Sequence, residues 1–424
     1  MKKGYGDLPK KIAYLGSGIF GQAMAYTLAH HNRKGNPIEH CLWNRSSETT
    51  EQLIESLKKP NYTNEKVYLD PNKLPKDSLS FYSGYTGSQG LDDCIDGADL
   101  IIIGVSSAGI LEISKNLAKK DIPKNVLIVS LSKGIIEHKN RLYLPSEAME
   151  LYLPDNPIAA LSGLTFAEEI FEKADTFANV ALNYADTITK RIDRKEMYER
   201  LKRIFNIGHL TTFRYDNILW VETGGAAKNV YGIASGYTNR MLQLRHNRLG
   251  SHNENLYLNT LLSLAMYAGI EMRTIYNKLR KKDRNPRDYL LRTHVFTNQS
   301  IPAWDGDRYG TLLGRKSRNF RYGELKAEGR SDKDPEIKKL GTIEGINTTK
   351  QLTNLFDEEE KKVQVQLLAG VNEWLVGRAT VEQVVKDLIE YLRSVDGRKG
   401  SKKSVSRIIK KKKQESQLDR SNSI

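Results

Sequence analysis

The feature that most constrains the fold of this chain is an apolar segment near the N-terminus that ends in a glycine-rich turn. The segment Lys11–Leu15 has the sequence KIAYL, and it runs into Gly16, Gly18 and Gly21 with the spacing G-x-G-x-x-G. A helical pattern follows from Phe20 to His31. A buried strand that turns through glycines directly into a helix is the first part of a βαβ unit. We therefore predict a parallel α/β sheet at the start of the chain.

Further segments in the first half of the chain are apolar along most of their length and have the residue types of strands. They are Ile38–Trp43, Asp99–Val105, Asn125–Ser132, Pro157–Gly163 and Ala178–Tyr184. Strands without apolar–polar alternation are buried on both faces, and the helical segments between them supply the cover. The pattern predicts an α/β fold with a parallel, doubly wound Rossmann-type sheet.

The pattern changes near residue 216, beyond which the strand signals nearly vanish. Long helical patterns follow over Val221–Arg240, Asn253–Arg280, Glu358–Gly377 and Val381–Ser394. A chain of 424 residues is too long for one compact core. We therefore predict a dinucleotide-binding domain over residues 1–216, an all-helical substrate domain over 217–395 and a disordered tail over 396–424.

Basic charge is concentrated at the C-terminus. The chain has a formal net charge of +15, and residues 398–424 contain ten Lys or Arg against two Asp or Glu. A modestly basic body suits an anionic substrate such as a phosphate. The tail is expected to make only weak, salt-sensitive contacts with anionic surfaces such as nucleic acid or acidic lipid.

The cysteine and histidine content argues against a disulfide scaffold and against a metal enzyme. Only Cys41 and Cys94 are present, and the eight histidines show no metal-ligand spacing. The N-terminus has no apolar run after its lysines, and no window reaches the length of a membrane span. We expect a cytoplasmic protein with no metal and no stable membrane insertion.

The glycine motif predicts a site for a dinucleotide. Gly16 allows the tight turn, Gly18 lets the backbone approach a pyrophosphate, and Gly21 lets the helix pack closely on the strand. The N-terminus of the helix offers free N–H groups and the positive end of a dipole to the phosphates. The predicted cofactor-binding residues of this loop are Gly16, Ser17, Gly18, Ile19, Phe20 and Gly21.

The second predicted strand leads into Asn44, Arg45 and Ser46. An Asp or Glu usually stands at this tip and binds the ribose hydroxyls of NAD, whereas an arginine accommodates the 2′-phosphate of NADP. Arg45 is therefore a candidate cofactor-binding residue, and the cofactor is NAD or NADP. The alternative is that Arg45 is a solvated loop residue near the adenine.

Segments spread along the chain carry a resemblance to a known family. They are GSGIFGQAMA from Gly16, SLSKGI from Ser130, LSGLTFAEE from Leu161, ETGGAAKNVYGIASG from Glu222, GDRYGTLLGRKSRNFRYG from Gly306 and, more weakly, TIEGINTTK from Thr342. Together they span most of the body of the chain, and they resemble the NAD-dependent glycerol-3-phosphate dehydrogenases. ETGGAAKN and SRNFRYG are the specific segments, because a generic Rossmann protein lacks both.

The resemblance implies a reaction and three catalytic residues. The family reversibly reduces dihydroxyacetone phosphate to sn-glycerol 3-phosphate with NAD(P)H, which supplies glycerophospholipid synthesis, and a homodimer is expected. Lys228 would exchange a proton with the central oxygen of the substrate. Lys133 would polarise the same oxygen from across the site, and Asp307 would orient and tune a lysine.

The resemblance also implies the residues that bind the substrate phosphate and the rest of the cofactor. Arg318 and Asn319 would hold the phosphate, with help from Asn229 and Thr311. The cofactor-binding set extends to Lys133, Arg318 and Glu344.

Elementary chemistry supports these residue types independently. Reduction of a ketone places negative charge on its oxygen, so a cationic donor is required there. Lys228 lies in a stretch of small apolar residues, where a lysine without a task is costly to bury. A guanidinium such as that of Arg318 can hold two phosphate oxygens at once. The plainer interpretations are that Lys133 caps a loop and that Arg318 is a surface arginine.

The chain departs from the family at several positions. Leu164 and Ser106 stand where the family has prolines, and Arg308 stands where it has a leucine. The stretch Arg280–Ala303 has the character of an insertion. Two alternatives therefore stay open. One is a related dehydrogenase for another hydroxyacid or a sugar acid, and the other is a non-catalytic nucleotide-sensing or nucleic-acid-binding protein.

Overall fold

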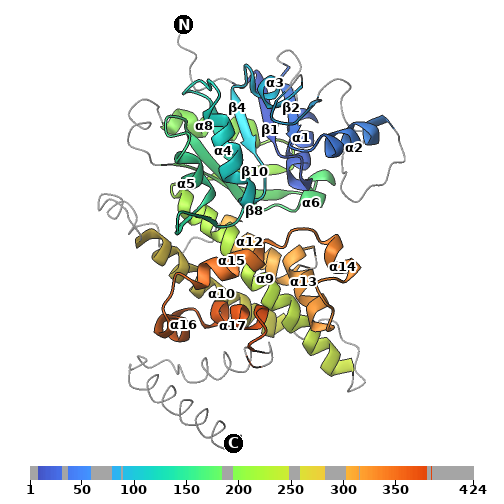
Figure 1. Ribbon diagram of the computed structural model, residues 1–424, viewed down its shortest axis with the longest axis vertical. Helices are drawn as coiled ribbons and strands as arrows, with labels where there is room; N and C mark the ends of the chain where they lie inside the picture. Colours follow the sequence, from blue (N-terminus) through green and yellow to red (C-terminus); the bar gives the residue numbers. More distant parts are fainter. Residues whose placement is uncertain are drawn as a thin grey trace, which may run out of the picture.

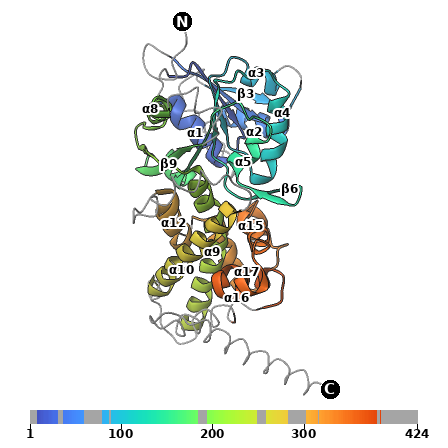
Figure 2. The same cartoon turned by 90° about the vertical axis from the view of Figure 1, so that its left-hand side faces the viewer.

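The computed structural model describes residues 8–30, 37–58, 79–86, 89–183, 194–247, 258–281, 302–314, 316–379 and 383. Over these residues the chain forms a sheet region, with helices on both faces, and a helical region that adjoins one edge of the sheet (Figures 1 and 2). The predicted tail over 396–424 lies outside the described residues, as does the predicted helix over Val381–Ser394 apart from Gln383. Within the described parts, no helix combines the length and the apolar character that a membrane crossing requires.

The strands of the described residues form one large sheet and one small hairpin. The sheet contains β1 (Lys11–Leu15), β2 (Glu39–Asn44), β3 (Leu79–Ser83), β4 (Leu100–Ile103), β5 (Leu127–Ser130), β8 (Ile158–Leu164), β9 (Thr176–Leu182) and β10 (Leu210–Arg214), and the hairpin contains β6 (Ile136–His138) and β7 (Arg141–Tyr143). The order across the large sheet is β10-β9-β8-β5-β4-β1-β2-β3. Strands from β3 to β8 in this order are parallel, as predicted for a dinucleotide-binding sheet.

The prediction of a wholly parallel sheet is wrong at β9. This strand pairs with β8 in the antiparallel direction, and β10 is parallel to β9. The connection between β8 and β9 contains only the short helix α6 (Ala167–Phe171). A parallel crossover needs a dozen or more residues, and residues 165–175 are too few to cross the sheet and return. The apolar pattern alone does not distinguish the two directions, because both strands are buried.

The strands are apolar throughout because both faces of the sheet are covered. On β1, Ile12 and Tyr14 lie in one hydrophobic core, and Ala13 and Leu15 lie in another. Successive side chains of a strand point to opposite faces, so a sheet covered on both sides needs apolar residues at every position. The helices that cover the two faces are α1 (Ile19–His30), α6 and α8 (Arg194–Phe205) on one side, and α3 (Leu91–Ile95), α4 (Ile110–Ala118) and α5 (Pro145–Glu150) on the other.

The helical region begins at α9. Its elements are α9 (Ile218–Asn247), α10 (Leu258–Lys281), the π-helical turn η3 (Pro302–Gly306), α12 (Asp307–Leu313), α13 (Arg318–Ala327), α14 (Pro335–Lys339), α15 (Glu344–Thr353), α16 (Glu358–Gln364) and α17 (Gln366–Leu375). The helices predicted over Val221–Arg240 and Asn253–Arg280 are confirmed within the described residues. The single helix predicted over Glu358–Gly377 is wrong, because the backbone of Val365 (φ −142, ψ 50) leaves the helical region and separates α16 from α17.

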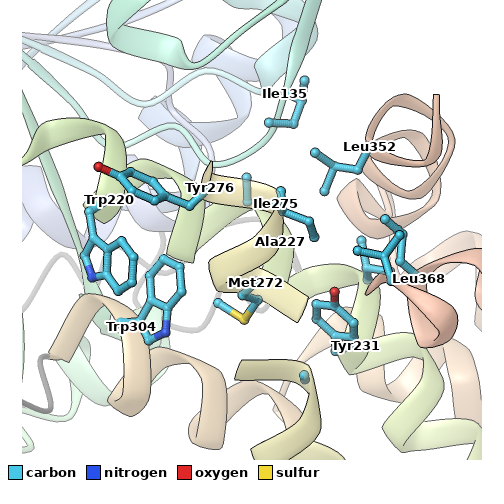
Figure 3. Packing of buried hydrophobic residues seen from close by; sticks show 14 of the residues in the cluster. Ile135, Trp220, Ala227, Tyr231, Met272, Ile275, Tyr276, Trp304, Leu352 and Leu368 are labelled. Atoms are coloured by element: carbon cyan, nitrogen blue, oxygen red, sulfur yellow. The ribbon is translucent and has the colours of Figure 1, made fainter. Parts of the chain in front are cut away.

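The long helix α9 is the centre of the second core. Its first turns pack on β8 and β9, and the rest of the helix contacts α10, α12, α13 and α15. Figure 3 shows Tyr231 of α9 near Met272 of α10, and the stacked indole rings of Trp220 and Trp304. The two ring centroids lie 3.7 Å apart. One helix thus links the edge of the sheet to the interior of the helical region.

The closest helix contact is between α9 and α13. A Cβ atom on Gly236 would lie 1.9 Å from the carbonyl oxygen of Phe320, and one on Gly323 would lie 2.1 Å from that of Ile233. Any side chain at either position would force the helices apart. The segment from Arg318 to Ala327 is therefore held against α9 at a fixed distance.

Candidate functional site

The candidate site lies where the carboxyl ends of the strands meet α9 and α12. Lys133 follows β5, and Gly163 is near the end of β8. Lys228 lies on α9, and Asp307 is the first residue of α12. In open α/β sheets this edge is where ligands bind, because the loops after neighbouring strands converge there.

Asp307 joins the two lysines that the sequence singled out. Its Oδ1 atom accepts a hydrogen bond from Lys228 Nζ, and its Oδ2 atom lies 3.1 Å from Lys133 Nζ. Lys228 and Asp307 are buried, whereas the Lys133 side chain keeps 21% of its exposure. Residues separated by 174 positions of sequence thus form one group of two cations and one anion. Such a group can supply a proton and positive charge to a reacting oxygen.

Burial lowers the pKa of Lys228 from its usual 10.5 to about 7. Removal of the ammonium from water is the largest cause, and the charge of Lys133 acts in the same direction. The carboxylate of Asp307 opposes the shift, because it favours the charged form. A lysine with a pKa near 7 can both give and take a proton at neutral pH, which is what a reversible acid–base group must do.

Three of the four predicted phosphate-binding residues lie along α9 between Asn229, which directly follows Lys228, and Gly232. Asn319 Nδ2 donates to Asn229 Oδ1 at 3.0 Å, and Asn319 Oδ1 accepts from the backbone N–H of Gly345 at 3.0 Å. The side chains of Thr311 and Asn319 both lie against Gly232, where a Cβ atom would be 2.9 Å from Thr311 Cγ2. These three polar side chains are buried, and their mutual contacts fix their positions.

Arg318 and Glu344 lie beside this group, and Glu344 contacts the sheet domain. Arg318 is exposed at the start of α13, and its charge reaches the carboxylate of Glu344. Glu344 Oε2 accepts from Ser107 Oγ at 2.9 Å, across 237 positions of sequence. Burial is the largest cause of the raised pKa of Glu344. The N-terminus of α15 is therefore attached to the loop after β4.

The glycine loop fits a dinucleotide. Gly16 has a φ of +113, and a Cβ atom there would lie 2.8 Å from the backbone of Gly104. A Cβ atom on Gly18 would meet no atom within 4 Å, so the space in front of the N-terminus of α1 is open. The ring of Phe20 lies 5.9 Å from Lys133 Nζ. The loop thus leads from open space at the helix terminus toward the lysine group, which is the path a nicotinamide dinucleotide needs.

Arg45 lies at a different part of the same edge, beside β2. Its Nη1 atom pairs with Glu112 Oε2 at 2.9 Å. Next to it, Asn44 donates to Ser17 Oγ and accepts from the backbone N–H of Ser46, which ties the tip of β2 to the glycine loop. Arg45 therefore lies at the tip of β2, next to the glycine loop.

The departures from the family have local structural consequences. Leu164 covers α12, since a Cβ atom on Gly310 would lie 2.1 Å from Leu164 Cδ1. Arg308 is buried against Gly269 of α10, and its Nη2 atom pairs with Asp305 at 2.6 Å. Glycine at position 269 gives the guanidinium the room that a family leucine would not need.

Sequence reasoning missed several residues that support the site. Glu222 accepts from the backbone N–H and the hydroxyl of Ser146, which connects the start of α9 to α5. Burial raises the pKa of Glu222 to about 8. Ser107 and Glu112 were also missed. Their partners, Glu344 and Arg45, lie far away in the sequence, and no local spacing predicts a contact between such distant residues.

Together the fold and the site define a two-domain, nicotinamide-dependent dehydrogenase. Comparison with protein families specifies which one. The model of the NAD-dependent glycerol-3-phosphate dehydrogenase N-terminus matches residues 11–188, and the model of the C-terminus matches residues 217–386. The chain belongs to this family.

Individual relatives agree. A glycerol-3-phosphate dehydrogenase [NAD(P)+] from Bacillus velezensis is 27% identical over 384 residues, which cover 90% of this chain and 94% of the relative. The protein of the same name from Synechocystis is 24% identical and covers 91% and 94%. The structure of glycerol-3-phosphate dehydrogenase from Coxiella burnetii has a TM-score of 0.65 at 22% identity, with 90% of this chain and 99% of that chain covered, and it supports the fold.

Proposed function

We propose that the chain catalyses the reversible reduction of dihydroxyacetone phosphate to sn-glycerol 3-phosphate with NADH or NADPH. One observation carries the proposal. Lys228 and Lys133 share the carboxylate of the buried Asp307, at the edge of the sheet that faces the glycine loop. The names of the relatives agree with this substrate and cofactor.

The lysine group would handle the proton and the developing charge. When bound, the nicotinamide supplies the hydride. Lys228 Nζ would give a proton to the central oxygen during reduction and take it back during oxidation. Lys133 would stabilise negative charge on the same oxygen, because its ammonium is already in place before the reaction. Asp307 would hold both ammonium groups in position.

The buried polar side chains Asn229, Asn319 and Thr311 would bind the phosphate end of the substrate. Asn229 directly follows Lys228 and is bonded to Asn319. Thr311 lies with Asn319 against Gly232, one turn along α9 from Lys228, and all three polar side chains are buried. The exposed Arg318 directly precedes Asn319 at the start of α13 and would supply the charge that a phosphate dianion needs. A three-carbon phosphate would then be held at both ends, with its carbonyl at the lysines.

Further proposals concern the organisation of the protein. The domain boundary at residues 216 and 217 falls directly before α9, in agreement with the change of structure there.

A homodimer is supported by exposed apolar side chains on one face of α10, namely Leu258, Met266 and Ile270. A cytoplasmic location agrees with the free, buried thiols of Cys41 and Cys94. Light scattering of the wild type and of Met266→Glu would test the dimer.

The reaction is tested by initial rates, measured as absorbance of the reduced nicotinamide. We expect turnover of dihydroxyacetone phosphate to exceed that of unphosphorylated dihydroxyacetone by about tenfold or more, since hydrogen bonds to a charged group are strong. Equal rates for the two ketones would argue for another substrate. The full panel includes 3-hydroxyacids and sugar acids, oxidised with NAD and NADP.

The pH dependence tests the role of Lys228 separately. Reduction needs the protonated lysine, so kcat/KM for dihydroxyacetone phosphate should fall as the pH rises through about 7. Oxidation needs the neutral lysine, so kcat/KM for sn-glycerol 3-phosphate should rise over the same range. Profiles with the same slope in both directions would contradict the assignment.

A further inference from the structure

The ion pair of Arg45 and Glu112, beside the glycine loop, concerns the choice between the two cofactors. Arg45 directly follows β2, and Glu112 lies in the first turn of α4, which follows β4. In the sheet, β2 and β4 are the two neighbours of β1. The pair Arg45–Glu112 therefore spans the carboxyl end of β1, beside the glycine loop, where the ribose of the adenosine would lie.

Glu112 has a second neighbour, the phenol of Tyr85. Burial raises the pKa of Tyr85 to about 12, and the nearby carboxylate of Glu112 acts in the same direction. The Tyr85 ring packs on Trp43, with the centroids 5.1 Å apart, and Trp43 Nε1 donates to the carbonyl oxygen of Gly84 at 2.6 Å. The carboxylate thus lies between the phenol of Tyr85 and the guanidinium of Arg45, with 44% of the Glu112 side chain exposed.

We propose that Glu112 is a specificity-determining residue that disfavours the 2′-phosphate of NADPH and thereby favours NADH. The inference rests on the proposed function only in requiring that the chain binds a nicotinamide dinucleotide. A 2′-phosphate would compete with Glu112 for Arg45 and would meet the carboxylate as a like charge. A ribose with free hydroxyls meets an acceptor instead. The tip of β2 has no carboxylate of its own, and Glu112 of α4 places one beside it.

The test is the affinity of the full-length protein for each cofactor, measured as dissociation constants of NADH and NADPH by nucleotide fluorescence without substrate. We expect Glu112→Gln to tighten NADPH binding by about three- to tenfold at low salt, because one repelling charge is removed from a well-hydrated site. NADH should change by less than about twofold. Arg45→Gln should weaken NADPH and leave NADH nearly unchanged.

A matched control comes from the opposite edge of the sheet. Lys124 and Asp155 form an exposed pair at 2.7 Å, just before β5 and β8. Asp155→Asn removes one surface carboxylate, as Glu112→Gln does, and should move neither dissociation constant. Exposed pairs of this kind contribute little to folding, so all of the variants should fold.

Each outcome separates this inference from the proposed function. If the protein binds both nucleotides and Glu112→Gln leaves the ratio of the NADPH and NADH dissociation constants unchanged, the role of Glu112 is overturned and the proposed reaction stands. If the protein binds neither nucleotide, both are overturned. If Glu112→Gln binds NADPH more tightly relative to NADH than the wild type does, and this change is smaller at high salt, the inference is supported.

Discussion

The sheet domain and the helical domain bury their side chains according to different rules. On the sheet, all residues of β4 and β5 are buried and nearly all are apolar. The buried His40 of β2 is uncharged at neutral pH, because burial lowers its pKa to about 4. Around α9 in the helical domain, by contrast, ionisable groups such as Lys228, Asp307 and Glu271 are enclosed.

The difference between the two domains shows where buried ionisable groups, which cost folding free energy, are concentrated. A buried ionisable group is expensive unless it is paired or hydrogen-bonded. Lys228 and Asp307 pair with each other at the proposed site. Glu271 has no part in that site, and it binds the backbone N–H groups of Leu367 and Leu368 at the N-terminus of α17. The helical domain thus depends on exact polar pairing for both its chemistry and its packing.

The largest expected effect comes from breaking the carboxylate contact at α17. Glu271 also accepts from Tyr231 at 3.0 Å, so Glu271→Ala leaves three buried donors without an acceptor. We expect the free energy of unfolding to fall by about 3–5 kcal/mol, measured by urea denaturation. The exposed Glu358→Ala on α16 is the control and should change it by less than about 0.5 kcal/mol. Equal losses in the two variants would contradict this account.

The pH dependence of the same carboxyl sharpens the comparison. Burial raises the pKa of Glu271 from 4.5 to about 7, so the folded chain binds this proton more tightly than the unfolded chain. Its contribution to stability is therefore complete below about pH 4.5 and is lost as the pH rises toward 7. The stability difference between the wild type and Glu271→Gln should shrink over this range. A difference that is independent of pH would show that the carboxyl stays ionised.

The second effect concerns catalysis. Lys228→Met should reduce turnover by about 10²-fold or more, because an acid–base group is lost. The dissociation constant of the reduced cofactor should change by less than about twofold, since the glycine loop is intact. Lys316→Met removes an exposed lysine that pairs with Glu169 and should leave turnover unchanged. Residual activity above about a tenth of the wild type would exclude Lys228 as the proton donor.

The same contrast explains how much could be predicted from the sequence. The glycine motif and the run Lys11–Leu15 indicated β1 and α1 almost to the residue, since local pattern and burial agree there. The direction of β9 was wrong, because an apolar strand reads the same in either direction. The edge strand β3, with half-buried and exposed residues, gave no signal at all.

The candidate site was predictable only through its motifs. Small residues around Lys228 marked it as unusual, and the resemblance brought Lys133 and Asp307 to the same site. The contacts of Ser107 with Glu344 and of Arg45 with Glu112 join positions 237 and 67 residues apart. Such pairs depend on the topology of the sheet and on the placement of α15, so no spacing in the sequence could reveal them.

The third effect tests the proposed phosphate site. Arg318→Ala should weaken binding of dihydroxyacetone phosphate by about 2 kcal/mol, because charged hydrogen bonds are lost. Its rate should approach that of unphosphorylated dihydroxyacetone, as measured by kcat/KM. The control is Arg321→Ala in the same helix, whose guanidinium pairs with the buried Glu324 and the exposed Glu336. A similar loss for both ketones would mean that Arg318 does not bind the phosphate.

The smallest effect tests the apolar side of the comparison. Ile102 lies in the middle of β4 and is 1% exposed, in a core formed by apolar side chains of the sheet and α1. Ile102→Val removes one methylene group and should lower the free energy of unfolding by about 1 kcal/mol. Ile102 is paired in the sheet with Tyr14, which is bonded to His40. Burial raises the pKa of Tyr14 and lowers that of His40 to about 4, so neither group titrates between pH 5 and pH 8 and the loss should be the same at both. A pH-dependent loss would show that charge is buried next to β4, and the sheet would then follow the rule of the helical domain.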